Sequence, residues 1–151
     1  VPQGVSYKKA NEAVRSRLNW IRKHSQKMED LKREHASKLV DVSHISYGEK
    51  KQQLIQRVAI LAQQYGFHYN KIFIRKQRTR WGSCSGNNNI NLNIKLKQLP
   101  DKLIDYVILH ELLHTRIKNH RRDFWVELNR LTGDAKALSA QVKSYHLGFM
   151  E

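Results

Sequence analysis

The sequence contains a single cysteine, Cys84, which excludes an intramolecular disulfide. No apolar run approaches the roughly 20 residues that a membrane span needs, and no signal-peptide segment opens the chain. Internal repeats and low-complexity tracts are also missing. These absences predict a soluble protein, and the lone cysteine favours a cytoplasmic location.

Acidic residues are scarce as well: 13 Asp and Glu face 28 Lys and Arg, which gives a net charge of +15. Residues 1–80 hold 18 of the basic residues and 6 of the acidic ones, so the surplus belongs mainly to the first half. Such a surface attracts polyanions and makes nucleic acid a possible partner, although a solvated helix face explains the same charge. The length predicts one domain, and the start at Val1 suggests a part of something longer.

Apolar residues recur at helical spacing over most of the chain. The first such segment, with Ser6 as its N-cap, predicts a long amphipathic helix. A second helix is expected from about residue 49 to 65, because Gly66 supplies a stop signal. Three further helices are predicted after Pro100, up to Gly133 and over residues 135–145.

Three shorter segments have the composition of strands. They are residues 71–76, 79–84 and 90–96. In the third, apolar and polar residues alternate strictly, which predicts one buried and one exposed face. The turn-forming residues 85–89 predict a hairpin between the second and third strands.

Residues 110–114, His-Glu-Leu-Leu-His, lie in the most apolar predicted helix. Positions four apart share one helix face, so His110 and His114 can bind the same cation. Glu111 lies about 100° away, close enough to act as general base on a metal-bound water. Zn²⁺ is the expected cofactor because this pattern is typical of zinc hydrolases. Chance gives the bare pattern in about one such sequence in fifty, so two merely structural histidines are the weaker explanation.

A catalytic zinc site usually has three protein ligands and one open position. His120 is the predicted third ligand, and the helix has to end between His114 and His120 because a continuous helix would turn the third side chain away. Asn119 is the expected place of the break, since asparagine tolerates the left-handed conformation. Glu127 and His146 are the alternative third ligands.

Several motifs together resemble the YgjP-like metallopeptidase family, most closely over residues 78–128. They are Arg-Trp-Gly-Ser-Cys-Ser at 80–85, Ile-Asn-Leu-Asn at 90–93, the ten residues 105–114, Asn-His at 119–120 and Phe-Trp at 124–125. The family is described as zinc-dependent hydrolases related to SprT-like and WLM domains, which include proteases that act on proteins crosslinked to DNA. The resemblance implies an α+β, zincin-like fold that is mainly helical, with a small antiparallel sheet of about three strands beside the metal helix.

The resemblance also implies the same site as the spacing does. Its zinc ligands are His110, His114 and His120, and its catalyst is Glu111. The hairpin expected beside the metal helix supplies the candidate substrate-binding residues Arg80, Trp81, Asn91 and Asn93. Candidate oxyanion donors are Tyr106, Arg80 and Tyr145. Cys84 is expected to be a small buried residue without a redox role.

The predicted activity is cleavage of peptide bonds in a protein or peptide by Glu-activated, zinc-bound water. A single domain would combine a basic N-terminal helical region, residues 1–48, with a catalytic core, residues 49–151. Nucleotide phosphohydrolysis is one alternative, since some family members are associated with nucleotide pyrophosphatase activity, but the chain has no glycine-rich phosphate loop. A DNA-associated protease or binding module that uses the basic N-terminal half is another.

Overall fold

The chain divides into two units in the computed structural model, Val1–Ser37 and Lys38–Glu151. The structure describes residues 7–145, without the side chains of residues 7–10, 28, 31–32 and 34–38. The predicted N-cap Ser6 and the alternative ligand His146 lie outside the described residues.

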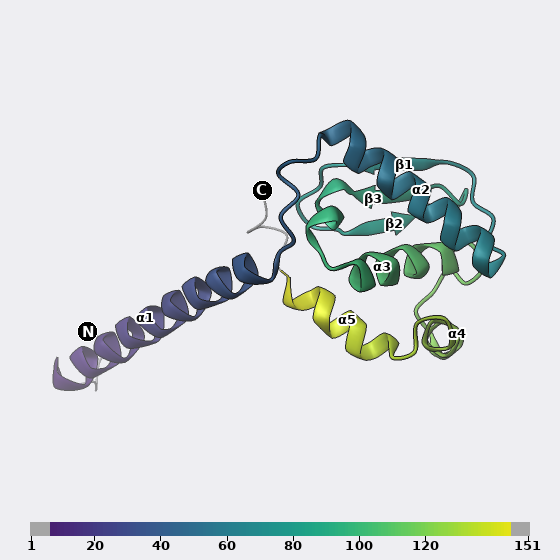
Figure 1. Cartoon of the computed structure of the whole chain (residues 1–151). Helices are drawn as coiled ribbons and strands as arrows, with labels where there is room; N and C mark the ends of the chain where they lie inside the picture. The colour runs from purple at the N-terminus through teal and green to yellow at the C-terminus, as the bar shows by residue number, and fades with distance from the viewer. Residues whose placement is uncertain (1–6, 146–151) are drawn as a thin grey trace. The chain divides into compact units, whose positions relative to one another are not determined.

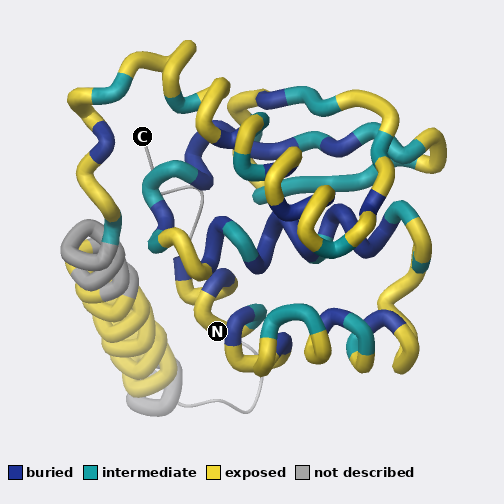
Figure 2. The backbone as a smooth tube through the Cα atoms, turned by 45° about the vertical axis from the view of Figure 1, so that its right-hand side comes forward, coloured by how far each residue is buried: buried dark blue, intermediate teal, exposed yellow. Residues whose placement is uncertain are grey.

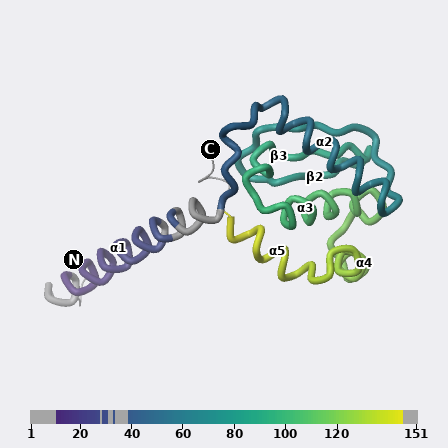
Figure 3. The backbone as a smooth tube through the Cα atoms, in the orientation of Figure 1, coloured from purple at the N-terminus to yellow at the C-terminus, as the bar shows by residue number. Residues whose placement is uncertain are grey.

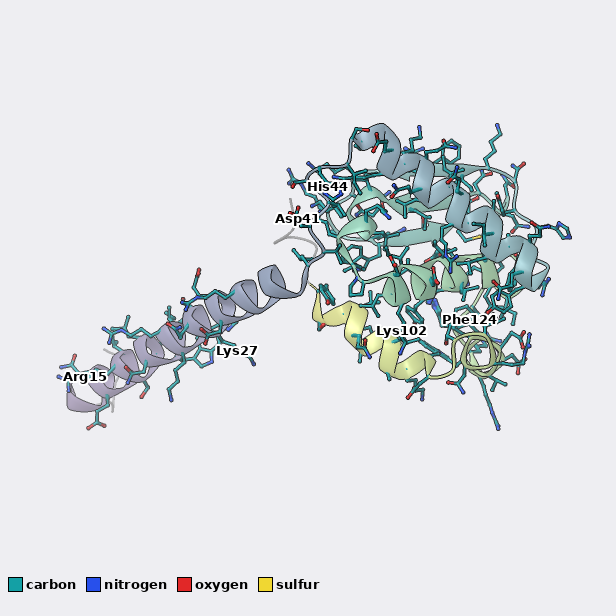
Figure 4. All side chains as sticks on the ribbon, in the orientation of Figure 1. Arg15, Lys27, Asp41, His44, Lys102 and Phe124 are labelled. Atoms are coloured by element: carbon teal, nitrogen blue, oxygen red, sulfur yellow. The ribbon has the colours of Figure 1, made fainter. Side chains whose placement is uncertain are left out.

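The described part of the first unit lies in helix α1, Tyr7–Lys38, which confirms the predicted long helix. All of its described side chains are exposed, among them the large apolar residues Val14, Leu18 and Trp20. Figure 4 shows Arg15 and Lys27 projecting from this helix.

The second unit is mainly helical with one small sheet, as predicted. Its helices are α2 (Tyr47–Tyr65), the 3-10 helix η1 (Ile94–Gln98), α3 (Asp101–Leu113), α4 (Arg122–Thr132) and α5 (Ala135–Ser144). Its strands are β1 (Ile72–Arg75), β2 (Gly82–Cys84) and β3 (Ile90–Asn93). No helix in the described part of the chain has the length and apolarity to cross a bilayer.

Helix α3 lies between the sheet and the last two helices (Figures 1 and 3). The sheet and α2 pack against α3, while α4 and α5 cover it from the side away from the sheet. Nearly all residues from 103 to 113 are consequently buried, as the dark blue of Figure 2 shows. A helix covered on opposite sides is apolar around most of its circumference, which explains the composition of this segment.

Local sequence signals set both ends of α2. The Ser46 hydroxyl accepts a hydrogen bond from the backbone N–H of Glu49, 3.2 Å away, and this satisfies one free donor of the first turn. Gly66 has a φ of 72° and its N–H donates to Ala62, which confirms the predicted stop. One face of α2 enters the core through Leu54, Val58, Leu61 and Ala62.

The sheet has the order β1-β3-β2 and is mixed. The predicted β2–β3 hairpin is confirmed by antiparallel pairing of Ser83 with Asn91. The prediction of an entirely antiparallel sheet is wrong for β1, which pairs in parallel with β3. The chain reverses direction twice between these two strands, so they run the same way. Strand β3 is central, and β1 and β2 form the two edges of the sheet.

Strand β3 is shorter than the alternation of residues 90–96 predicts. It ends at Asn93, whose side-chain oxygen accepts a hydrogen bond from the backbone N–H of Lys95, 3.1 Å away, and begins η1. Asparagine bonded in this way to its own backbone competes with the hydrogen-bonding ladder of a strand. The predicted exposed face is also wrong at this point, because Asn93 is fully buried.

Candidate metal centre

Three imidazole rings converge at the end of α3. The Nε2 atom of His110 lies 3.2 Å from that of His114 and 3.1 Å from that of His120. The Nε2 atoms of His114 and His120 are 2.9 Å apart. His110 lies on α3, His114 is the C-cap residue of that helix, and His120 lies in the α3–α4 connection, so the tertiary structure brings together all three predicted metal ligands.

The donor set fits a divalent transition metal. Three histidine nitrogens bound tetrahedrally to zinc at about 2.0–2.1 Å would lie about 3.3 Å from one another, close to the spacing found here. Among the side chains that the structure describes, these three histidines are the one group of three or more potential ligands close enough to share an ion. A His₃ set also leaves a fourth position for water or substrate, as catalytic zinc sites require.

A hydrogen bond holds the second histidine of the cluster, His114, in an orientation that suits metal binding. The Nδ1–H of His114 donates to the backbone carbonyl of Ile117, 2.8 Å away, so the lone pair on Nε2 is free for a cation. Burial lowers the pKa of His114 and, together with the neighbouring imidazoles, lowers that of His110 to about 3. Both rings are therefore neutral, which is the form that binds metal.

The ring of Phe124 packs against all three imidazoles. Its ring centroid lies 4.9, 4.6 and 5.0 Å from those of His110, His114 and His120, and its side chain is fully buried. Figure 4 labels it at the beginning of α4. The sequence identified this residue as part of a helix and of the family motif, but did not predict this supporting role. The Phe-Trp motif lies in the first turn of α4 and carried no sign of which rings Phe124 would contact.

The connection that carries the third histidine begins earlier than predicted. Helix α3 ends at Leu113, and successive backbone N–H groups from His114 onward bond to carbonyls three residues back. Asn119 is not in the left-handed conformation; Asn88 is the non-glycine residue with positive φ in the described part of the chain. The Asn119 side chain instead accepts a hydrogen bond from the backbone N–H of Arg121, 2.9 Å away. A tightened last turn therefore replaces the predicted left-handed break.

Two cations fasten this connection to the rest of the second unit. The Arg116 guanidinium lies 4.3 Å from the ring centroid of Phe67 and donates to the carbonyl of Gly66, at the end of α2. Lys118 reaches the β2–β3 turn, where its Nζ donates to the carbonyl of Ser85 at 3.0 Å. These contacts hold an otherwise exposed segment against α2 and the β2–β3 turn, and in this way they help to position the third imidazole.

Glu111 lies beside the histidines but is not part of the cluster. Its side chain is buried, and burial raises its pKa to about 8, against the opposing effect of the positive charge on Arg80. A divalent cation on the adjacent histidines would favour the ionised carboxylate, because opposite charges stabilise each other in a poorly solvated site. The carboxyl group is thus suited to accept and release a proton near neutral pH.

The remaining sequence candidates fall in different places. Arg80 and Trp81 line a cavity next to Glu111, whereas Asn91 does not. Asn93 is fully buried, and its side-chain amide donates to the carbonyls of Gln77 and Arg80 at 2.8 and 2.9 Å. The structure therefore makes Asn93 a residue that holds the segment before β2 rather than one that faces substrate.

The other candidates for ligand and donor roles also separate. Glu127 bonds to Arg130 on its own helix and lies outside the histidine cluster. Tyr106 is buried, packs edge-on against His110 with 6.0 Å between ring centroids, and lines the same cavity as Arg80. Tyr145 is buried and is absent from the lining of that cavity.

Two solved structures share the fold of the second unit. They are crystal structures of metallopeptidase zymogens, abylysin of Pyrococcus abyssi and jannalysin of Methanocaldococcus jannaschii. Each aligns with a TM-score of 0.52, at 19% and 23% sequence identity, over 59% of this chain and over 90% and 92% of theirs. The fold is that of the zincin-like metallopeptidases.

The family follows from the sequence match. A family model described as "YgjP-like, metallopeptidase domain" matches residues 47–145, well over half of the chain. The chain therefore belongs to the YgjP-like family, and the matched domain extends from the start of α2 to the end of α5. No curated protein matches the sequence. Family and fold together support a metal-dependent peptidase, and the family implies a catalytic metal.

Proposed function

We propose that the second unit is a zinc peptidase in which His110, His114 and His120 bind the metal and Glu111 is the general base. The convergence of the three Nε2 atoms within 3.2 Å of one another carries this proposal. When bound, zinc supplies a Lewis acid that polarises a carbonyl and lowers the pKa of a water. A His₃ donor set and a nearby carboxylate favour zinc over magnesium or calcium, which prefer oxygen ligands.

The protein's own residues would supply the proton chemistry. Glu111 follows His110 on α3, and its burial removes competing water, so its carboxylate can take a proton from the attacking water and return it to the leaving amine. The Ile117 carbonyl keeps the His114 ring in a single tautomer throughout. Tyr106 is a candidate oxyanion donor, because burial raises the pKa of its phenol and keeps the hydroxyl proton in place.

Strand β2 offers a place for the substrate backbone. The N–H of Asn93 donates to the carbonyl of Trp81, and that of Ser85 to the carbonyl of Asn89, so residues 81, 83 and 85 face β3. The backbone groups of Gly82 and Cys84 consequently point away from β3, because these groups alternate along an antiparallel strand. An extended peptide could pair with this outer edge beside Glu111, and this supports the proposal of peptide rather than phosphoester substrates.

Metal removal tests the proposed function directly. Protein loaded with zinc is expected to cleave an unfolded protein, a chelator is expected to abolish the cleavage, and one equivalent of zinc is expected to restore it. Release of new N-termini measures the reaction. Cleavage that persists after zinc has been removed to below detection would contradict the proposal. Metal-dependent turnover of nucleoside triphosphates without peptide cleavage would favour the phosphohydrolase instead.

Substitution of Gly82 by alanine is expected to lower peptidase activity more than its effect on stability explains. A Cβ atom there would lie 3.1 Å from Cγ of Glu111 and 3.0 Å from the carbonyl oxygen of Asn91, so the Glu111 side chain would have to move. Overpacking of this kind costs about 1–3 kcal/mol of unfolding free energy, and a displaced catalytic group costs up to about 100-fold in rate. Thermal unfolding and kcat/KM measure the two effects. Gly86→Ala is the control, since nothing lies within 4 Å of the added atom.

Two further expectations remain predictions. One is that the basic first helix binds nucleic acid, and the other is that the chain divides into a helical region and a catalytic core. We propose that the catalytic part lies within the second unit, because every side chain placed at the metal centre comes from residues beyond Lys38.

A further inference from the structure

A cavity of about 230 Å³ opens directly beside the metal centre. His110 and Glu111 form one of its sides, so an occupant would adjoin the bond to be cut. Cavities for drug-sized ligands measure about 300–1,000 Å³, and this one is smaller. Its size and place suit a single substrate side chain.

The floor of the cavity is apolar. Val107 of α3 and Val142 of α5 are buried, and Trp81 is partly buried beside them. Two polar groups also line the cavity, the Tyr106 hydroxyl and Ser139, and they form a hydrogen bond with each other. The aliphatic part of a side chain would be well placed against these surfaces.

The rim of the cavity is positively charged. Arg80, in the segment before β2, and Lys143, on α5, are both exposed and both line the cavity. The charge of Arg80 reaches the site, because it lowers the pKa of Glu111. Among the described residues that line the cavity, Glu111 is the one acidic residue.

Two more cations, Lys76 and Arg78, lie in the same segment before β2 as Arg80. Burial, followed by the charges of Lys76 and Arg78, lowers the pKa of Lys95 on η1, so these cations lie close enough to interact. Fields of several like charges attract oppositely charged substrates and disfavour like-charged ones. The two cations that line the cavity itself, Arg80 and Lys143, therefore favour a negatively charged occupant.

We propose that this cavity is a specificity pocket for an acidic side chain next to the scissile bond. The methylene groups of a substrate glutamate or aspartate pack on Val107 and Val142, and its carboxylate meets Arg80 and Lys143. The substrate class is thus acidic peptides. This inference rests on the proposed peptidase function, since a specificity pocket can select substrates only in a protein that cleaves peptide bonds.

The test uses three otherwise identical peptides with Glu, Gln or Lys next to the scissile bond and the zinc-loaded protein. We expect kcat/KM to be roughly 10-fold higher for the Glu peptide than for the Gln peptide, and lowest for the Lys peptide. Ion pairs of the substrate carboxylate with Arg80 and Lys143 at the exposed rim can supply a difference of this size. Lys143→Glu is expected to remove the preference for Glu and to raise cleavage of the Lys peptide. The effect should fall as salt concentration rises.

Lys136→Glu is the matched control, because Lys136 is exposed on the same helix, carries the same charge and does not line this cavity. Thermal unfolding of both variants establishes that each is folded. Equal cleavage of all three peptides, or equal loss of preference in both variants, would overturn the pocket while leaving the peptidase function intact. Failure to cleave any of the peptides while zinc is bound would overturn the proposed function and this inference with it.

Discussion

Glu111→Gln is expected to lower kcat/KM for peptide cleavage by about 10²- to 10⁴-fold while zinc still binds with unchanged stoichiometry. A positioned general base typically contributes a factor of this size, and the amide of glutamine cannot accept the proton. The metal ligands are untouched, because Glu111 lies outside the histidine cluster. Steady-state kinetics and metal analysis of the same preparation measure the two quantities together.

Thermal unfolding separates loss of chemistry from loss of structure in this variant. Glu111 is buried, so a neutral side chain of the same shape removes a carboxyl group that is costly to ionise there, and the melting temperature should stay the same or rise. Glu127→Gln is the matched control: its carboxylate bonds to Arg130 away from the site, and full activity is expected. Full peptidase activity of zinc-bound Glu111→Gln would assign the base elsewhere.

His120→Ala is expected to lower the affinity for zinc by more than about 100-fold. Loss of a residue that only supports a metal ligand lowers metal affinity by roughly 10- to 100-fold, and loss of a ligand itself should cost more. The ring supplies one of three converging nitrogens, and two histidines from one helix do not complete a catalytic zinc site. Competition with a chromophoric chelator measures the affinity. Peptidase activity at limiting zinc should fall in parallel.

The exposed position of His120 makes this variant easier to interpret than a change at His114, which is buried. The metal-free His120→Ala protein should unfold at nearly the same temperature as metal-free wild type. Added zinc should raise the unfolding temperature of the variant much less than that of wild type, because stabilisation by a ligand grows with the ratio of its concentration to its dissociation constant. His68→Ala, at an exposed histidine outside the cluster, should behave as wild type. Unchanged zinc affinity of His120→Ala would remove the third ligand.

The helices were predictable because their signals are local. Apolar spacing, the glycine after α2 and the proline before α3 act within one or two turns of the chain, and the structure has the helices where these signals place them. The length of β3 was predicted wrongly because a local signal for a strand competed with another local signal. Alternation over residues 90–96 favoured a long strand, but the Asn93 side chain bonds to the next turn and ends it.

The pairing of His110 and His114 was determined by the sequence alone, because four-residue spacing on a helix fixes two side chains on one face. The meeting with His120 was decided by the tertiary structure. It depends on the end of α3 at Leu113 and on Phe124, whose ring contacts all three imidazoles. It also depends on Arg116 and Lys118, which bind the intervening segment to the end of α2 and to the β2–β3 turn.

The surroundings of Glu111 were likewise decided by tertiary structure. Its burial, the edge of β2 beside it and the cavity between Arg80 and Lys143 all arise from elements far apart in the sequence. A motif of five residues determines which groups can bind a metal and move a proton, because their spacing is set by the helix itself. Which substrate reaches them depends on packing between segments, and no short-range pattern in the sequence encodes that.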